Sequence, residues 1–188
     1  MRKLIALITA LAIATVSIAQ TIDFDKKLKE LGIELYTPAK PMGNYVKAVR
    51  TGNLLYLAGH GPTKADGSNI TGKVGKELTT EQGYDAAKQV GIAILSTLKA
   101  ELGDLNKVKR IVKVLGMVNC TENFGDQPKV MNGFSDLMVA VFGDKGKHAR
   151  SAVGIHYFGL IAKIFGAVDH AQYFYNALYF VQIAKFCF

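Results

Sequence analysis

"TTEQGYDAAKQVGIAILSTLKAELG", residues 79–103, is the stretch of sequence that decides the fold. Thr79 and Gln82 have the spacing of a capping box, and Gly103 stands where a helix would end. Between these two signals the apolar residues recur on one helical face, and they are Ala86, Val90, Ala93, Ile94 and Leu98. The sequence therefore predicts a helix over residues 80–102.

The segments on either side alternate between strand and helix patterns. They predict a short helix over residues 24–31 that Gly32 stops, a hairpin over residues 45–57, a buried strand over residues 108–119, a second long helix over residues 128–142 and a strand over residues 149–155. Asp126 lies near the start of the second long helix, and Gly143 follows its end. This order predicts an α+β domain with two helices packed on one face of a mixed β-sheet.

Residues 1–19 have the pattern of a signal peptide. Arg2 and Lys3 precede an apolar run over residues 4–18, and small residues favour cleavage before Gln20. The alternative is a membrane anchor, but the apolar stretch is short for a span. The sequence thus predicts export to the periplasm or the medium, and no membrane contact after cleavage.

Residues 156–188 break the pattern of the preceding domain, which covers residues 20–155. Ten of the eighteen Phe and Tyr residues fall in this tail, and neither a helical nor a strand period runs through it. One interpretation is a C-terminal helix pair that uses its aromatic side chains as core. The interpretation that we favour is a segment that did not co-evolve with the rest, such as the product of a shifted reading frame.

Composition excludes several classes of function. The chain has 188 residues and a formal net charge of +8, but its lysines are scattered rather than clustered with aromatic residues, so we expect no nucleic-acid partner. Cys120 and Cys187 allow at most one disulfide, and two separate thiols are favoured. The four histidines show no metal-ligand spacing, so we expect neither a metal nor a cofactor.

Several segments together identify a resemblance to a known family. They are "NYVKAVRTGNLLYLAGHGP", the stretch from "GKVGKELTTEQGYDAAK" through "LGDLNKVKRIVKVLGMVN", "PKVMNGFSDLMVAVFG" and "HARSAVGI". They resemble the RidA (YjgF/YER057c/endoribonuclease L-PSP) family in its longer bacterial subgroup, in one register over about residues 30–155. The resemblance implies a chorismate-mutase-like fold, a homotrimer with small-molecule clefts between subunits, and hydrolysis of reactive enamines and imines to 2-oxoacids and ammonia.

The resemblance also implies four substrate-binding residues. Arg150 matches the arginine that grips the substrate carboxylate, Tyr45 a tyrosine that lines the cleft, and Asn132 an asparagine of the second helix. His60 falls where short-chain deaminases carry a glutamine. Three of them have a structural alternative: Arg150 could satisfy backbone carbonyls at a subunit interface, Tyr45 could be packing, and Asn132 could tie down its helix.

Two departures from the family leave the activity open. Ala152 stands where deaminating members often carry cysteine, and residues 156–188 do not match the family's final "VEIEA"-like strand, whose glutamate helps to activate water. We therefore assign no catalytic residue. The main hypothesis is an exported imine deaminase, and the alternative is a trimer that binds small carboxylates without turnover. Ribonuclease activity finds no support in a pair of catalytic histidines or a strongly basic face.

Overall fold

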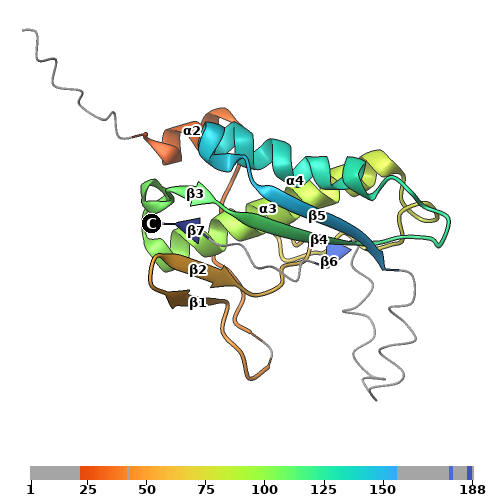
Figure 1. Ribbon diagram of the computed structural model, residues 1–188, viewed down its shortest axis with the longest axis horizontal. Helices are drawn as coiled ribbons and strands as arrows, with labels where there is room; N and C mark the ends of the chain where they lie inside the picture. The colour runs from red at the N-terminus through yellow and green to blue at the C-terminus, as the bar shows by residue number, and fades with distance from the viewer. Residues whose placement is uncertain (1–21, 42, 156–177, 180–185, 188) are drawn as a thin grey trace, which may run out of the picture.

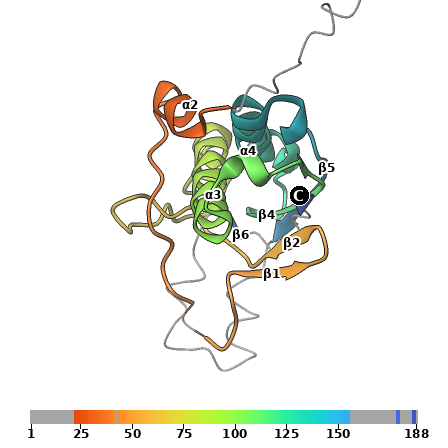
Figure 2. The same cartoon turned by 90° about the vertical axis from the view of Figure 1, so that its left-hand side faces the viewer.

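Two long helices lie side by side on one face of the strands, as predicted (Figure 1, Figure 2). The computed structural model describes residues 22–41, 43–155, 178–179 and 186–187. Helix α3 spans Thr80–Leu102 and helix α4 spans Gln127–Phe142. No helix within these residues is long and apolar enough to cross a bilayer.

The sequence signals at the ends of α3 act as predicted. The Thr79 hydroxyl accepts a hydrogen bond from the Gln82 backbone N–H at 3.2 Å, and the Gln82 side-chain oxygen accepts one from the Thr79 N–H at 2.9 Å. Gly103 ends the helix with a φ of +75°, which a residue with a side chain rarely adopts. The capping box therefore fixes where α3 begins, and the glycine fixes where it stops.

Helix α4 begins one residue before the predicted start. Asp126 precedes it, but its carboxylate makes no capping hydrogen bond. Its Oδ2 instead accepts a hydrogen bond from Lys129 Nζ at 2.9 Å. A salt bridge on the surface thus replaces the expected cap, and Gly143 ends α4 at a φ of +62°.

The strands form two hydrogen-bonded sheets. One has the order β1-β2-β7-β3 and contains the predicted hairpin of β1 (Ala48–Thr51) and β2 (Leu54–Leu57), while the other has the order β5-β4-β6. The single strand predicted over residues 108–119 is wrong in detail, because it divides at Val112 into β3 (Arg110–Ile111) and β4 (Lys113–Asn119). The two parts pair with different partners, and β4 pairs in parallel with β5 (Ala149–Ile155).

A short helix, α2 (Phe24–Glu30), packs its apolar side chains against the core. Phe24 and Leu28 are buried, as the helical pattern predicts. Leu31, expected on the same face, is 40% exposed. It is the C-cap residue, at the end of the helix. Two 3₁₀ turns, η1 (Leu105–Lys107) and η2 (Gly143–Gly146), follow α3 and α4.

Two dipeptides from the C-terminal tail belong to the sheets. Strand β6 (Leu178–Tyr179) runs antiparallel to β4, and strand β7 (Phe186–Cys187) lies between β2 and β3. The backbone of the tail thus supplies strand positions although its sequence lacks a strand period. The predicted signal peptide and the rest of the tail lie outside the described residues.

The two long helices approach each other closely at Gly133 of α4. A Cβ atom at this position would overlap the backbone carbonyl oxygen of Tyr84 in α3. Because that obstacle is helix backbone rather than a flexible side chain, the helices would have to separate to admit it. Glycine at this position therefore sets the distance between α3 and α4.

Gly133→Ala is expected to lower the free energy of unfolding by about 2 kcal/mol, because overpacking at a rigid contact forces backbone shifts. Gly125→Ala is the matched control, since a Cβ there would meet no atom within 4 Å and the backbone is not in the left-handed region. Urea denaturation at a fixed protein concentration measures both. Equal stabilities of the two variants would contradict the close contact.

Candidate functional site

Arg150 lies near the start of β5, which is the edge strand of its sheet among the described residues, opposite Val114 of β4. Side chains alternate between the two faces of a strand, so Arg150 and Ser151 point to opposite sides. Ser151 accepts a hydrogen bond from Lys113 Nζ at 2.8 Å, whereas Arg150 faces α4. The chain passes from β4 to β5 through α4 (Figure 1). Two side chains of α4, Asn132 and Ser135, contact the arginine.

The guanidinium of Arg150 is held at one of its ends only. Its Nη1 donates to Asn132 Oδ1 at 2.9 Å and to Ser135 Oγ at 3.0 Å, and both acceptors are uncharged. The ion pairs found within the described residues join other side chains, so no carboxylate of this region neutralises Arg150. Three N–H groups, on Nε and Nη2, make no hydrogen bond to the described residues. The half-buried cation is therefore oriented but not neutralised.

Ser135 also contacts His148, which precedes β5. Ser135 Oγ lies 3.2 Å from His148 Nε2, and His148 Nδ1 lies 2.6 Å from the carbonyl oxygen of Gly146. A carbonyl oxygen only accepts, so Nδ1 carries the proton and Nε2 of the neutral ring is an acceptor. The edge of the ring packs against Phe134, with centroids 5.7 Å apart and planes at 75°. Backbone and packing thus fix both the tautomer and the orientation of His148.

The surroundings keep His148 uncharged near neutral pH. Burial lowers its pKa below the ordinary value, the carbonyl of Gly146 acts in the opposite direction, and the positive charge of Arg150 lowers the pKa further. The ring therefore offers an unprotonated nitrogen to the hydroxyl of Ser135.

Ser135 and His148 were not predicted from the sequence as site residues. Their spacing nevertheless carries a signal: Asn132 and Ser135 are three residues apart on one helical face, and His148, just before β5, is two residues from Arg150, which is the spacing of side chains on one side of an extended chain. Either pattern alone is common. Only the crossover that sets α4 against β5 shows that these two pairs meet.

His60, predicted to bind substrate, belongs to a different part of the chain. Its Nδ1 lies 2.8 Å from the carbonyl oxygen of Ala58, and its Nε2 lies 2.8 Å from Thr97 Oγ1 on α3. The residue is 8% exposed, and burial lowers its pKa to about 4. Both ring nitrogens make hydrogen bonds within the chain. The uncharged His60 ring therefore lines the adjacent cavity and has no free N–H donor.

The cavity beside His60 has a volume of about 390 Å³. It lies between α3 and the segment over residues 36–39, which runs alongside that helix (Figure 2). The Tyr36 hydroxyl donates to the carbonyl oxygen of Thr63 at 2.8 Å and closes one side. Lys47 also lines the cavity, and burial lowers its pKa. No residue of the Arg150 cluster, which comprises Asn132, Ser135, His148 and Arg150, lines this cavity.

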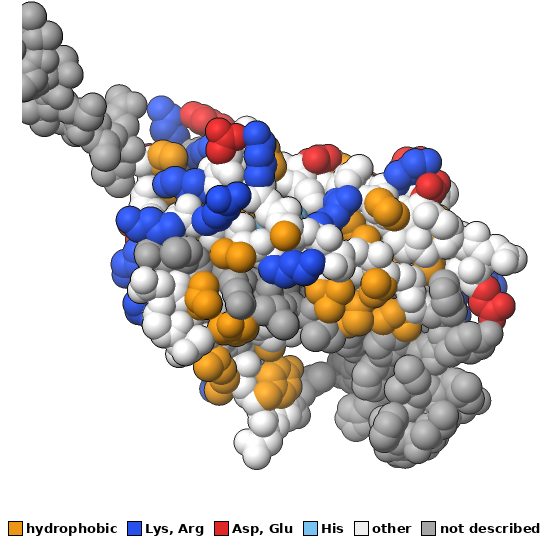
Figure 3. Space-filling view, viewed as in Figure 1, with side chains coloured by type: hydrophobic (Ala, Val, Ile, Leu, Met, Phe, Trp, Pro, Cys, Tyr) orange, Lys and Arg blue, Asp and Glu red, His pale blue; other side chains and the backbone are white. Residues whose placement is uncertain are grey.

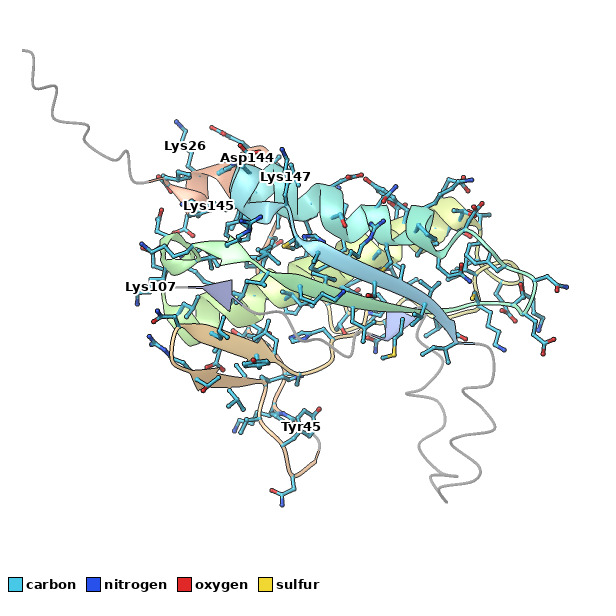
Figure 4. All side chains as sticks on the ribbon, in the orientation of Figure 1. Lys26, Tyr45, Lys107, Asp144, Lys145 and Lys147 are labelled. Carbon is cyan, nitrogen blue, oxygen red and sulfur yellow. The ribbon has the colours of Figure 1, made fainter. Side chains whose placement is uncertain are left out.

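Tyr45 lies on the loop before β1 and is 52% exposed. Figure 4 shows it at the opposite side of the molecule from Lys147, which is next to His148. The structure therefore brings together two of the four predicted residues, Arg150 and Asn132. It leaves Tyr45 and His60 away from them within one chain.

Two further observations bear on the chemistry. Ala152, which stands where deaminating relatives often have cysteine, is partly buried and packs against the core. Within the part of the chain that the structure describes, no three His, Cys, Asp or Glu side chains gather in a way that could hold a metal ion. The polar chemistry of this region therefore comes from the Arg150 cluster.

Several known proteins are similar to this chain in sequence or in fold. A protein from Trypanosoma cruzi, Protein TCP17, is 43% identical over 129 residues, which cover 68% of this chain and 81% of that protein. The crystal structure of Atu1372 from Agrobacterium tumefaciens, of unknown function, is 34% identical, with a TM-score of 0.69 over 84% of this chain and 89% of its own. A structure from Shewanella oneidensis MR-1, described as a "putative endoribonuclease", is 24% identical, with a TM-score of 0.70 over 85% of this chain and 99% of its own. This last likeness shows the fold alone.

The sequence profile of one family matches most of the chain. That family is described as "YjgF/chorismate mutase-like, putative endoribonuclease", and the match covers residues 25–160. It is the family that the sequence segments resemble, and the predicted α+β fold agrees with it. The chain therefore belongs to the YjgF/RidA family.

Proposed function

We propose that this protein binds small carboxylate-bearing imines through Arg150 and hydrolyses them to 2-oxoacids and ammonia. One observation carries the proposal: two neutral acceptors orient the Arg150 guanidinium while its charge stays unpaired within the described residues. An arginine that served only to balance charge would have a carboxylate partner. This one retains the Nε and Nη2 edge, which matches the two oxygens of a carboxylate.

The contribution of such a contact is large enough to select ligands. A charge-assisted hydrogen bond contributes about 1.5 to 3 kcal/mol, and a carboxylate on the Nε and Nη2 edge accepts two. Asn132 and Ser135 hold the guanidinium plane, so less side-chain entropy is lost when the ligand binds. Arg150 is therefore an affinity and orientation group for small acids.

Imine hydrolysis suits a site that mainly positions its substrate. The carbon of a protonated C=N group is already electrophilic, so water adds once it is held in line with that carbon. Holding the carboxylate one bond away from the reacting carbon fixes the position of the C=N group relative to the helix side chains. No cofactor is needed for this reaction.

We also infer that the working form is a homotrimer in which a second copy completes the cleft. Strand β5 is an edge of its sheet among the described residues, and its Val153 is 42% exposed. Tyr45, Val46 and Val49 are more than half exposed around β1, and apolar side chains gather along this side of the molecule (Figure 3). A neighbouring subunit would cover these apolar surfaces and bring its Tyr45 toward the arginine. We also propose that the trimer is exported, and the support for this is the signal-peptide pattern of residues 1–19.

Arg150→Ala is expected to lower kcat/KM for imine hydrolysis by about 100-fold, because it removes two charge-assisted hydrogen bonds to the substrate. A coupled assay that generates 2-aminoacrylate in situ measures the rate of hydrolysis. Arg110→Ala on β3 is the matched control, since it removes the same charge from an exposed position. It should stay within about twofold of the wild type.

Two outcomes would contradict parts of this proposal. Unchanged turnover in Arg150→Ala would remove the arginine from the site. If the wild-type protein shows no turnover but binds 2-oxobutanoate, and Arg150→Ala does not bind it, the chain is a carboxylate-binding module. Ala152 and the unmatched glutamate strand favour that second function, which isothermal titration calorimetry with 2-oxobutanoate would detect.

A further inference from the structure

The attack of water on an imine requires a group that accepts a proton, and the family glutamate has no match in this sequence. We propose that Ser135 and His148 supply this proton transfer, with Ser135 receiving the proton of the attacking water through bridging water and His148 acting through Ser135. The inference rests on the proposed function of Arg150 and identifies the group that would complete it. Its evidence is the set of contacts within the Arg150 cluster.

The hydroxyl of Ser135 has the right capacity for a relay. A serine hydroxyl donates one hydrogen bond and accepts two. Arg150 Nη1 donates into one lone pair at 3.0 Å, and the hydroxyl proton can point to His148 Nε2 at 3.2 Å, which is nearer than the Met131 carbonyl oxygen at 3.4 Å. The second lone pair remains to accept a hydrogen bond from water.

Arg150 contacts both the relay and the substrate. The guanidinium binds Ser135 with Nη1 and keeps the Nε and Nη2 edge for a carboxylate. A 2-imino acid held there has its C=N carbon directly bonded to the carboxylate carbon. Because Nη1 and this edge lie on opposite sides of the guanidinium, the attacking water reaches Ser135 Oγ through bridging water.

The proton and electron balance can be followed step by step. The water oxygen forms a bond to the carbon of the protonated C=N group. The π electrons of the C=N group move to nitrogen. The water passes a proton to Ser135 Oγ while the Ser135 hydroxyl proton moves to His148 Nε2. The proton returns by the same route to the amine nitrogen, the C–N bond breaks, and ammonia leaves. The hydroxyl group on the remaining carbon then passes its proton through Ser135 to His148, which gives the 2-oxoacid, and His148 releases this proton to solvent.

The charge of Arg150 makes the basicity of His148 depend on whether substrate is bound. Among the described residues, Arg150 on β5 is the one charged group that acts on His148, while α4 presents Phe134 and Ser135, and η2 presents the Gly146 carbonyl. A bound carboxylate neutralises Arg150 and so removes its electrostatic effect on the imidazole ring. His148 should therefore become a stronger base when the substrate arrives.

The first test compares kcat in three relay variants and one control variant with the imine assay. His148→Gln keeps a polar side chain that cannot take a proton, and Ser135→Ala interrupts the relay; each is expected to lower kcat about 100-fold with KM within about threefold. Ser135→Thr keeps the hydroxyl and should recover most of the rate. Ser151→Ala, on the opposite face of β5, is the matched serine control and should keep the wild-type kcat.

The pH profile of kcat separates proton transfer from a structural role. The wild-type rate should fall on the acid side as His148 becomes protonated, and His148→Gln should lack this fall. A wild-type kcat in both His148→Gln and Ser135→Ala, with Arg150→Ala still inactive, would overturn the relay and leave the proposed function standing. A wild-type protein that neither turns over imines nor binds 2-oxobutanoate would overturn both.

A second measurement does not depend on variant folding. NMR titration of the His148 ring in the wild-type protein, with and without 2-oxobutanoate, should show a higher pKa in the complex. His60, in a separate cavity, provides the internal control and should not shift. An unchanged His148 pKa in a protein that binds 2-oxobutanoate would overturn the coupling between Arg150 and the relay.

Discussion

Replacing Phe134 with alanine is expected to lower the free energy of unfolding by about 3 to 5 kcal/mol, because it opens a large cavity in the core. Phe134 has no exposed surface and lies on the face of α4 that packs into the core. Its ring also supports the edge of His148. The variant should therefore lose both stability and the fixed orientation of the histidine.

Urea denaturation at one protein concentration measures this effect, since any association between subunits makes stability depend on concentration. Phe134→Leu is the graded control, because it keeps most of the apolar volume and should cost less than about 1.5 kcal/mol. A loss below about 1 kcal/mol in Phe134→Ala would mean that the core around α4 can collapse into the space.

Lowering the pH from about 7 to about 4 is expected to destabilise the protein through His60, by about 3 kcal/mol in total. Burial lowers the pKa of His60 from 6.5 to about 4 in the folded chain, and the nearby Lys47 charge acts in the same direction. Between these two pKa values the unfolded chain binds a proton that the folded chain does not. Stability is thus complete above about pH 6.5 and falls as the pH approaches 4.

The measurement compares the wild-type protein with His60→Gln by urea denaturation at several pH values. The difference in unfolding free energy between the two proteins isolates His60, because His148, whose pKa is also lowered, is present in both. That difference should change across the window and become constant above about pH 7. A difference that stays constant from pH 4 to pH 7 would show that His60 is not buried in its neutral form.

Local signals were sufficient to predict the helices. The capping box at Thr79 and the glycine at position 103 give α3 its observed bounds, because both act through hydrogen bonds and backbone angles within one turn. Asp126 shows the limit of such reasoning, since Lys129 competes for its carboxylate. The strand over residues 108–119 divided for a related reason: its halves pair with strands that are distant in the sequence.

The site was predicted only in part. The family resemblance identified Arg150 and Asn132, and their side chains meet at 2.9 Å. It gave no role to Ser135 or His148. These residues are thirteen positions apart, on a helix and just before a strand, and no short sequence motif contains both. Tyr45 and His60 are separated from Arg150 within one chain, so whether they serve the same cleft depends on an assembly that a single chain does not contain.

All four members of the Arg150 cluster lie between positions 132 and 150, on one helix, on the strand that follows it and on the residue just before that strand. Contacts of such short sequence separation have a low loop-closure entropy and form early and independently of the chain ends. The described contacts that hold the guanidinium use only residues 132–150. Substitutions beyond residue 155 therefore leave these side chains unchanged.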